Sequence, residues 1–256
     1  MKYFASAVTD IGNTKKTNQD SVCVKIAQSE KYGQVAMAVL CDGMGGLDKG
    51  ELASATVIRA FSKWFEEELP LSLKKLSWSA LSDEWERIAK EQNYLIGQYG
   101  NKIESSVGTT LTAMLFIKDK YLIAHVGDSR VYSITSSVNQ LTEDQTFIAR
   151  EIKAGRMTSE QAKVHPKRNQ LLQCIGASRN VEPQMILGKT VKNSVYMFCS
   201  DGFRHVLTNE EIYENFNFDN LNDEQAMERN SRYLIDLVKS RNEKDNITVA
   251  LIKCIG

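Results

Sequence analysis

Residues 109–134 read TTLTAMLFIKDKYLIAHVGDSRVYSI and carry the clearest fold signal in the chain. They hold three runs rich in aliphatic, aromatic and β-branched residues, which are typical of strands: 109–117, 121–126 and 131–134. The turn-forming stretches 118–120 and 127–129 separate these runs. Connections this short join antiparallel strands, because a parallel crossover needs a dozen or more residues. The stretch therefore predicts an antiparallel meander in the middle of the chain.

Strand and helix signals alternate on both sides of this meander. Further strands are predicted at 21–27, 34–40, 185–187, 195–199 and 247–254. Helical spacing of apolar residues predicts helices at 50–69, 82–98, 147–154, 159–163, 209–215 and 223–241, with Pro70 ending the first of them. Two packed sheets with helices on both outer faces would bury every apolar stripe. We therefore expect an α+β fold, a four-layer α-β-β-α sandwich of two mostly antiparallel sheets covered by helices.

Composition limits the class of protein. The chain has 256 residues with 32 basic and 32 acidic side chains, so its formal net charge is zero and offers no electrostatic footprint for nucleic acid. It contains no apolar run long enough to span a membrane, its first ten residues lead us to expect no secretory signal, and its five cysteines show no C-x-x-C pairing. We expect a cytoplasmic protein with no nucleic-acid or membrane partner. A single domain over 1–256 is predicted, with an excursion from the core at about 144–179.

Carboxylates stand at the ends of predicted strands. Asp42 and Asp201 each follow an apolar run and precede a glycine, Asp128 follows Gly127, and Asp20 and Asp245 directly precede strands. One Asp-Gly pair is ordinary turn chemistry. If the five aspartates converge at one rim, however, their charges require cations, and hard divalent ions such as Mg²⁺ or Mn²⁺ prefer oxygen ligands. Two such ions lower the pKa of a shared water and hold a phosphate for in-line attack.

Six short motifs in a fixed order resemble one known family. They are Asn18-Gln19-Asp20-Ser21, Asp42-Gly43-Met44-Gly45-Gly46, Gly108-Thr109-Thr110-Leu111, Gly127-Asp128-Ser129-Arg130, Cys199-Ser200-Asp201-Gly202 and Asp245-Asn246-Ile247-Thr248-Val249. This pattern resembles the bacterial form of the PPM/PP2C family of metal-dependent protein serine/threonine phosphatases. The resemblance implies hydrolysis of phosphoserine and phosphothreonine in proteins, with a metal-activated water attacking phosphorus directly and no phosphoenzyme. It also implies a cognate bacterial serine/threonine kinase that supplies the phosphorylated substrates.

The resemblance assigns metal ligands to positions in this chain. Asp42 is expected to bridge two Mn²⁺ or Mg²⁺ ions, and the Gly43 carbonyl to bind one of them. Asp201 and Asp245 are expected to complete the other site. Asp128 matches the position that binds a weaker third ion.

Other matched positions concern catalysis and substrate. Asp20 is expected to form a hydrogen bond with metal-bound water. Lys15 stands where the family commonly has an arginine that holds the substrate phosphate, although the neighbouring Lys16 or a purely solvated loop remain open alternatives. Gln19 replaces a frequent glutamate, and the loss of that charge is expected to weaken the second ion.

Further departures lie elsewhere in the pattern. Met44 stands where many eukaryotic relatives have a histidine proposed as general acid, so another group must protonate the leaving group. Gln145 replaces a frequent histidine, and the sequence suggests no role for it. The excursion at about 144–179 matches the variable flap of the family. His165 within it is expected to have a structural role rather than that of a catalytic acid.

Two other functions fit parts of the sequence. A non-catalytic module that binds phosphoproteins could use the same fold, although the presence of all the core aspartates argues against it. A two-metal nuclease would need clustered Lys and Arg for the phosphate backbone, and the chain has no basic stripe.

Overall fold

The computed structural model describes residues 1–45 and 49–256, so Gly46 of the motif that starts at Asp42 lies outside the described part. The strands of the described residues form two sheets. The first sheet has the order β1 (Lys2–Asp10), β11 (Ile247–Ile255), β10 (Ser194–Cys199), β7 (Arg130–Ile134) and β8 (Val138–Gln140). The second has the order β2 (Asp20–Ser29), β3 (Gly33–Gly45), β5 (Leu111–Ile117), β6 (Lys120–Val126) and β9 (Gln184–Lys189), with β4 (Val107–Thr109) on β3.

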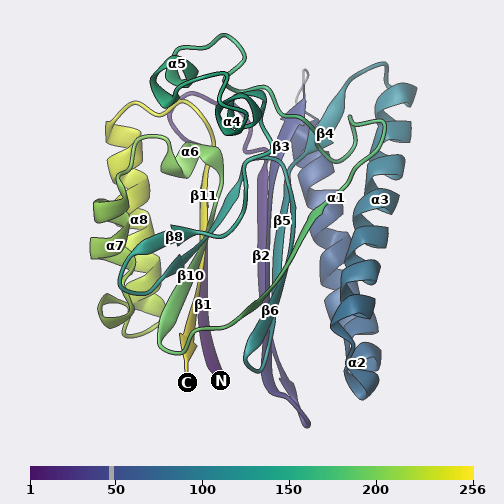
Figure 1. Ribbon diagram of the computed structural model, residues 1–256, viewed down its shortest axis with the longest axis vertical. Coiled ribbons are helices and arrows are strands. Elements are labelled where there is room, and N and C mark those ends of the chain that lie inside the picture. Colours follow the sequence, from purple (N-terminus) through teal and green to yellow (C-terminus); the bar gives the residue numbers. More distant parts are fainter. Residues whose placement is uncertain (46–48) are drawn as a thin grey trace.

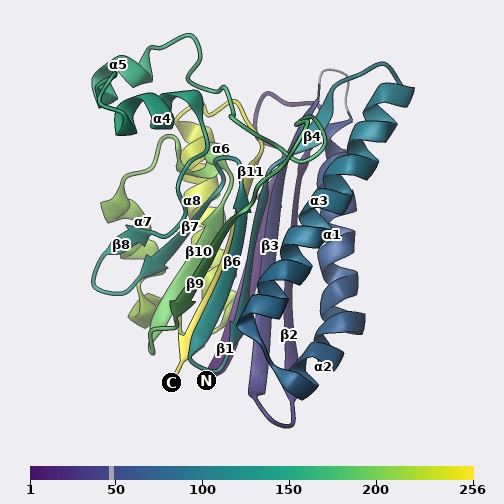
Figure 2. The same cartoon turned by 45° about the vertical axis from the view of Figure 1, so that its right-hand side comes forward.

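Every strand pair within the two sheets is antiparallel, and helices cover both outer faces (Figure 1). The helices are α1 (Gly50–Lys63), α2 (Leu69–Ser72), α3 (Trp78–Lys102), α4 (Phe147–Lys153), α5 (Ser159–Lys163), α6 (Asp201–Arg204), α7 (Asn209–Phe216) and α8 (Glu224–Ser240). Figure 2 shows α1 and α3 along the second sheet, with α7 and α8 on the far side of the first. The predicted four-layer α+β sandwich is confirmed.

Strand alternation builds the layers, as β3 illustrates. Its Val35, Met37 and Val39 pack towards α1 and α3, whereas Ala38 and Leu40 pack between the two sheets. Successive side chains of a strand point to opposite faces, so every strand with apolar residues on both faces serves two core layers at once. This double burial explains why the central strands read as almost continuous apolar runs.

The expected meander is correct for its first two strands and wrong for the third. β5 pairs with β6, but β7 pairs with β10 in the other sheet. The turn at 127–129 therefore carries the chain across the sandwich instead of reversing it within one sheet. As a result, Asp128 lies where the two sheets meet.

Two other expectations need correction. The strand β1 was not predicted, because its alternating small, polar and aromatic residues give a weak apolar signal. It nevertheless pairs with β11 over its whole length. Pro70 does not end the helical region: a π-helical turn at Trp64–Glu68 leads directly into α2. Proline is tolerated there because it stands in the first turn of α2, where no intrahelical N–H donor is needed.

The excursion at about 144–179 contains α4 and α5, which lie beyond one end of the sandwich, next to α6 (Figure 1). Its two ends pair with each other, since Phe147 N donates to Gln170 O at 2.8 Å and Leu172 N donates to Gln145 O at 2.8 Å. Within the described residues, no helix is long and apolar enough to cross a membrane.

Candidate active site

The backbone at the end of β3 is held by the motif that contains Thr109 and Thr110. Asp42 N donates to Thr110 Oγ1 at 2.8 Å, and Thr110 N donates to Asp42 O at 2.8 Å. The Thr109 hydroxyl donates to the same Asp42 carbonyl at 3.0 Å. These three bonds fix the carboxylate-bearing residue at the rim of the second sheet.

Asp20 lies opposite Asp42 on the neighbouring strand β2. Because side chains alternate along a strand, Asp20 shares a face with Val22 and Val24, which pack between the sheets. Asp20 is buried, and both of its carboxylate oxygens lack a hydrogen-bond partner. A buried acceptor without a partner is costly, so such an atom points to a ligand that completes it.

Asp201 and Asp245 come from the first sheet. Ser200 N donates to Thr248 O, and Thr248 N donates to Ser200 Oγ, both at 3.1 Å, which ties the end of β10 to the start of β11. Asp201 then opens α6, and its Oδ1 is buried without a hydrogen-bond partner. A Cβ at position 202 would lie 2.2 Å from the Asn246 carbonyl oxygen, so only glycine allows these two segments to approach this closely.

Asp128 is brought to the same rim by the crossing turn. Gly127 has a φ of +110°, and a Cβ there would lie 2.6 Å from Thr110 Cγ2. The hydroxyls of Thr110 and Ser129 are 3.0 Å apart. The turn that carries Asp128 therefore packs directly on the residue that holds Asp42.

We call Asp20, Asp42, Asp128, Asp201 and Asp245 the rim aspartates. Burial raises the pKa of Asp42 well above its usual value, and the charges of the other four rim aspartates add to the rise. Burial also raises the pKa of Asp20 to about 7, with Asp201 and Asp245 as charged neighbours that raise it further. Their negative charges therefore influence one another at the rim, and such a concentration of carboxylates favours a cation.

The rim aspartates suit a hard divalent ion in their chemistry, although they do not form a closed cage. Across residues 1–45 and 49–256, no three His, Cys, Asp or Glu side chains are gathered closely enough to hold an ion as they stand. The rim aspartates nevertheless offer carboxylate oxygens, which Mg²⁺ and Mn²⁺ prefer as ligands. Both oxygens of Asp20 and one oxygen of Asp201 are buried without a hydrogen-bond partner. These residues therefore fit such an ion in the nature of their donors and in their unpaired oxygens.

Lys15 lies on one of the expected ligands. Its Nζ is 2.6 Å from Asp245 Oδ1. Burial tends to lower the pKa of Lys15, but the bond to Asp245 and the charges of Asp42 and Asp201 outweigh that effect and raise it. Lys15 is thus a charged group at the edge of the aspartate cluster.

Asn246 organises the loop that carries Lys15, a role that the sequence did not reveal. Its Nδ2 donates to the carbonyl oxygens of Ile11 at 2.9 Å and Thr17 at 3.2 Å. Its Oδ1 accepts from Gln19 N at 2.9 Å. The residue after Asp245 therefore joins the loop before β2 to the start of β11.

Two arginines lie near Asp128, and the sequence analysis assigned no role to either. Arg130 makes a bidentate pair with Asp144 at 2.7 and 2.6 Å. Arg204 Nη2 donates to the Asp128 carbonyl oxygen at 3.2 Å and lies 3.6 Å from Asp144 Oδ2. Arg204 stands three residues after Asp201, one turn along α6, and that spacing is the signal that could have identified it.

The electrostatics of Asp128 reflect both kinds of neighbour. Burial raises its pKa to about 7, and Asp201 adds to the rise, whereas Arg204 and Arg130 oppose it. His205 also approaches the cluster, with Nε2 3.6 Å from Asp201 Oδ2 and Nδ1 3.4 Å from Glu243 Oε2.

Gln145 and His165, both singled out in the sequence, make contacts within the fold. Gln145 Oε1 accepts from Gly127 N at 3.0 Å and from Gln173 Nε2 at 2.9 Å, while Gln145 Nε2 donates to His125 O at 3.1 Å. His165 stacks on Phe147 with ring centroids 5.4 Å apart. Gln145 thus joins both ends of the excursion to the turn before Asp128.

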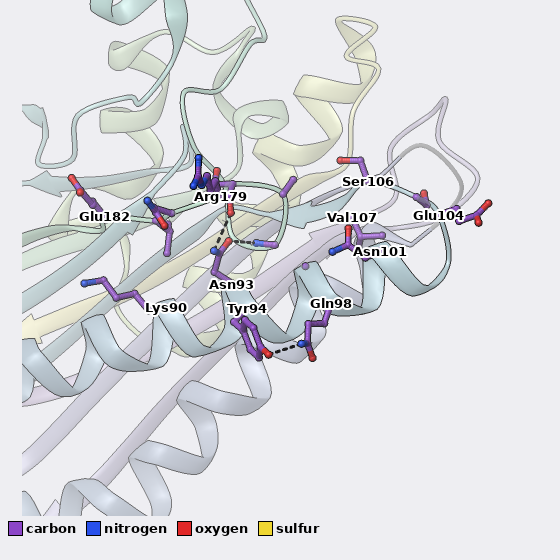
Figure 3. Close-up of a pocket in the computed structure, with 18 residues that line it drawn as sticks. Lys90, Asn93, Tyr94, Gln98, Asn101, Glu104, Ser106, Val107, Arg179 and Glu182 are labelled. Carbon is purple, nitrogen blue, oxygen red and sulfur yellow. Dashed lines mark hydrogen bonds between the residues drawn. The ribbon is translucent and has the colours of Figure 1, made fainter.

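A large cavity of the described chain lies elsewhere. It has a volume of about 1100 Å³ and runs between α3 and the segment 176–182, where Asn93 donates to Ser178 O (Figure 3). None of the rim aspartates lines it. A wide groove has room for a ligand, but the carboxylates define the chemistry, so we place the candidate active site at the rim.

Comparison with known proteins identifies the family of this chain. Residues 13–239 match the sequence profile of the family described as Protein phosphatase 2C. A putative protein phosphatase 2C-type from Streptococcus pyogenes serotype M6 is 30% identical over 251 residues, 96% of each chain. The S. agalactiae serine/threonine phosphatase structure has a TM-score of 0.85 and 30% identity, covering 99% of this chain and 100% of the other. A structure of the catalytic domain of the phosphatase PstP in complex with two manganese ions has a TM-score of 0.77 and 26% identity, covering 99% of each chain.

Proposed function

We propose that the rim aspartates form the metal-dependent active site of this chain. The chain belongs to the protein phosphatase 2C family and is a serine/threonine protein phosphatase. The observation that supports this most strongly is the raised pKa of the buried Asp20, Asp42 and Asp128, to which the charge of Asp201 contributes in each case. Asp42, Asp201 and Asp245 would hold two Mn²⁺ or Mg²⁺ ions, together with the Gly43 carbonyl. When bound, the ions would lower the pKa of a water and neutralise charge on the phosphate.

The side chains around this centre would prepare the reaction. Asp20 would accept a proton from the attacking water, because its carboxylate is buried and its pKa is raised to about 7. Lys15 would bind the substrate phosphate as a point charge, which requires its ammonium to leave Asp245. Asn246 holds the loop so that Lys15 stays beside the cluster.

The substrates are phosphoproteins, and we propose that a cognate bacterial serine/threonine kinase produces them. We also propose that the 256 residues act as one phosphatase domain, in which the segment at about 144–179 is a flap beside the active site. All five cysteines are free thiols, which supports a reducing compartment such as the cytoplasm.

A metal-dependence assay with p-nitrophenyl phosphate and a phosphothreonine peptide tests the proposal. The chelator-treated protein should hydrolyse neither compound until Mn²⁺ or Mg²⁺ is restored. Full activity in excess EDTA would overturn the metal-dependent mechanism.

Kinetics of Lys15→Ala test the phosphate-binding role separately. This variant should raise KM for the phosphopeptide more than it changes Mn²⁺ affinity, because the lost charge contacts phosphate rather than the ions. The matched control is Lys16→Ala. If Lys15→Ala has unchanged kinetics and Lys16→Ala does not, the role belongs to Lys16.

A further inference from the structure

Arg204 occupies an unusual place for a fixed positive charge. It lies on α6, and its side chain is only 14% exposed. Its Nη2 donates to the Asp128 carbonyl oxygen at 3.2 Å, while its Nε is buried without a hydrogen-bond partner. A buried guanidinium cannot lose its proton, so this charge is permanent.

The charge of Arg204 is not consumed by Asp144. That carboxylate already accepts two short bonds from Arg130 and stands 3.6 Å from Arg204, which is longer than a hydrogen bond. A bidentate pair of this kind satisfies the geometry of both its partners. Arg204 is therefore the cation that remains to balance Asp128.

Charge counting gives Asp128 a less negative surrounding than the other rim aspartates, although the charge of Asp201 also reaches it. Asp128 and Asp144 together carry two negative charges, and Arg130 and Arg204 carry two positive ones. In contrast, Asp20, Asp42, Asp201 and Asp245 carry four negative charges. In the described chain, the cation in contact with them is Lys15, joined by the His205 imidazole when it is protonated.

This imbalance has a direct consequence for metal binding. An excess of buried negative charge attracts divalent ions, whereas two carboxylates already balanced by two guanidiniums offer little uncompensated charge to bind a further cation. The sequence resemblance leads to the expectation of a weaker third ion at Asp128, and the surroundings of Asp128 in this chain do not fit such an ion.

We propose that the Arg204 guanidinium takes the place of a third metal ion at Asp128, so that the enzyme works with two ions. Arg204 joins Asp128 to α6, and α6 begins with Asp201. Arg204 therefore also holds the turn at 127–129 close to Asp201, a proposed metal ligand. This inference rests on the proposed two-ion active site.

Mn²⁺ titration of the chelator-treated full chain tests the inference, with free Mn²⁺ followed by electron paramagnetic resonance and heats by calorimetry. The native protein should bind two ions. Arg204→Gln should bind a third, at least about tenfold more tightly than any additional ion in the native protein, and Arg204→Gln combined with Asp128→Asn should return to two. The control is Arg232→Gln, which removes an exposed arginine paired with Glu228 on α8.

The outcomes are distinguishable. A third ion in the native protein that disappears in Asp128→Asn would overturn the inference, and this arm does not depend on whether the Arg204 variant folds. Two ions in both the native protein and a folded Arg204→Gln variant would also overturn it. Absence of any bound Mn²⁺ in the native protein would instead overturn the proposed active site itself.

Discussion

At the residue scale, Asp42 combines a central place in the proposed active site with an electrostatic cost, since burial and four neighbouring carboxylates raise its pKa. Its buried carboxylate faces four others, and their repulsion destabilises the metal-free fold. Asp42→Asn should therefore lower the turnover of p-nitrophenyl phosphate by about 100- to 1000-fold. The same change should raise the unfolding free energy of the chelator-treated protein by about 0.5–2 kcal/mol.

Denaturant unfolding and steady-state kinetics of Asp42→Asn check both effects. Asp119→Asn is the matched control, because Asp119 is exposed in the turn between β5 and β6. Full activity in Asp42→Asn would contradict the assignment, and lower stability would contradict the electrostatic argument.

His125 predicts a specific dependence of stability on pH. Burial lowers its pKa from 6.5 to about 4, its Nδ1 lies 3.0 Å from Thr112 Oγ1, and its Nε2 has no partner. The unfolded chain binds a proton near pH 6.5, while the folded chain resists it until about pH 4. The contribution of neutral His125 to the free energy of unfolding is therefore complete above pH 6.5 and is lost as the pH falls towards 4. At 1.36 kcal/mol per pKa unit, this loss reaches at most about 3 kcal/mol.

Unfolding free energies of native protein and His125→Gln between pH 7 and 4.5 test this point. The difference between the two should change across that window, while His165→Gln, in the exposed excursion, should follow the native protein. Parallel pH profiles for native protein and His125→Gln would rule out the buried neutral imidazole as the source.

At the element scale, the excursion is held to the core through Gln145. Its amide satisfies Gly127 N and His125 O and also binds Gln173. Gln145→Leu leaves those two backbone groups unpaired, which should cost about 1–3 kcal/mol each when buried. We expect faster cleavage within 147–170 in limited proteolysis, and little change for Gln28→Leu on an exposed strand. Equal cleavage of native protein and Gln145→Leu would show that other contacts hold the excursion.

The sequence identified most of the elements and most of the candidate site, and the failures have physical reasons. Apolar periodicity identified the central strands and the long helices because their burial is continuous. It missed β1, whose small alternating residues carry little apolar signal. It also could not show that the turn at 127–129 crosses between sheets, since a short turn within one sheet has the same composition.

The candidate site was likewise predicted in part from the sequence and missed in part. The carboxylates were predicted because they stand directly before or after apolar strands, within motifs of fixed order. Arg204, Asn246 and Asp144 were not assigned roles, because their partners lie in distant segments that only the folded chain brings together.

At the scale of the whole molecule, the proposed ligands come from both sheets, so metal binding should stabilise the entire sandwich. An ion that binds only the folded state adds about 2.7 kcal/mol at a concentration 100 times its Kd. For a chain of this size the melting temperature should rise by about 5–10 °C. Thermal unfolding with Mn²⁺ and with EDTA measures the shift, and Asp42→Asn should lose most of it. A shift of the same size in Asp42→Asn would place the stabilising ion outside the rim aspartates.

The most direct test of the account is a crystal structure of the Mn²⁺-loaded protein, with the ions located by anomalous scattering. We predict two ions bound by carboxylate oxygens of Asp42, Asp201 and Asp245, and no ion at Asp128 beside Arg204. Ions bound elsewhere, or Asp42, Asp201 and Asp245 too far apart to share them, would contradict the central claim.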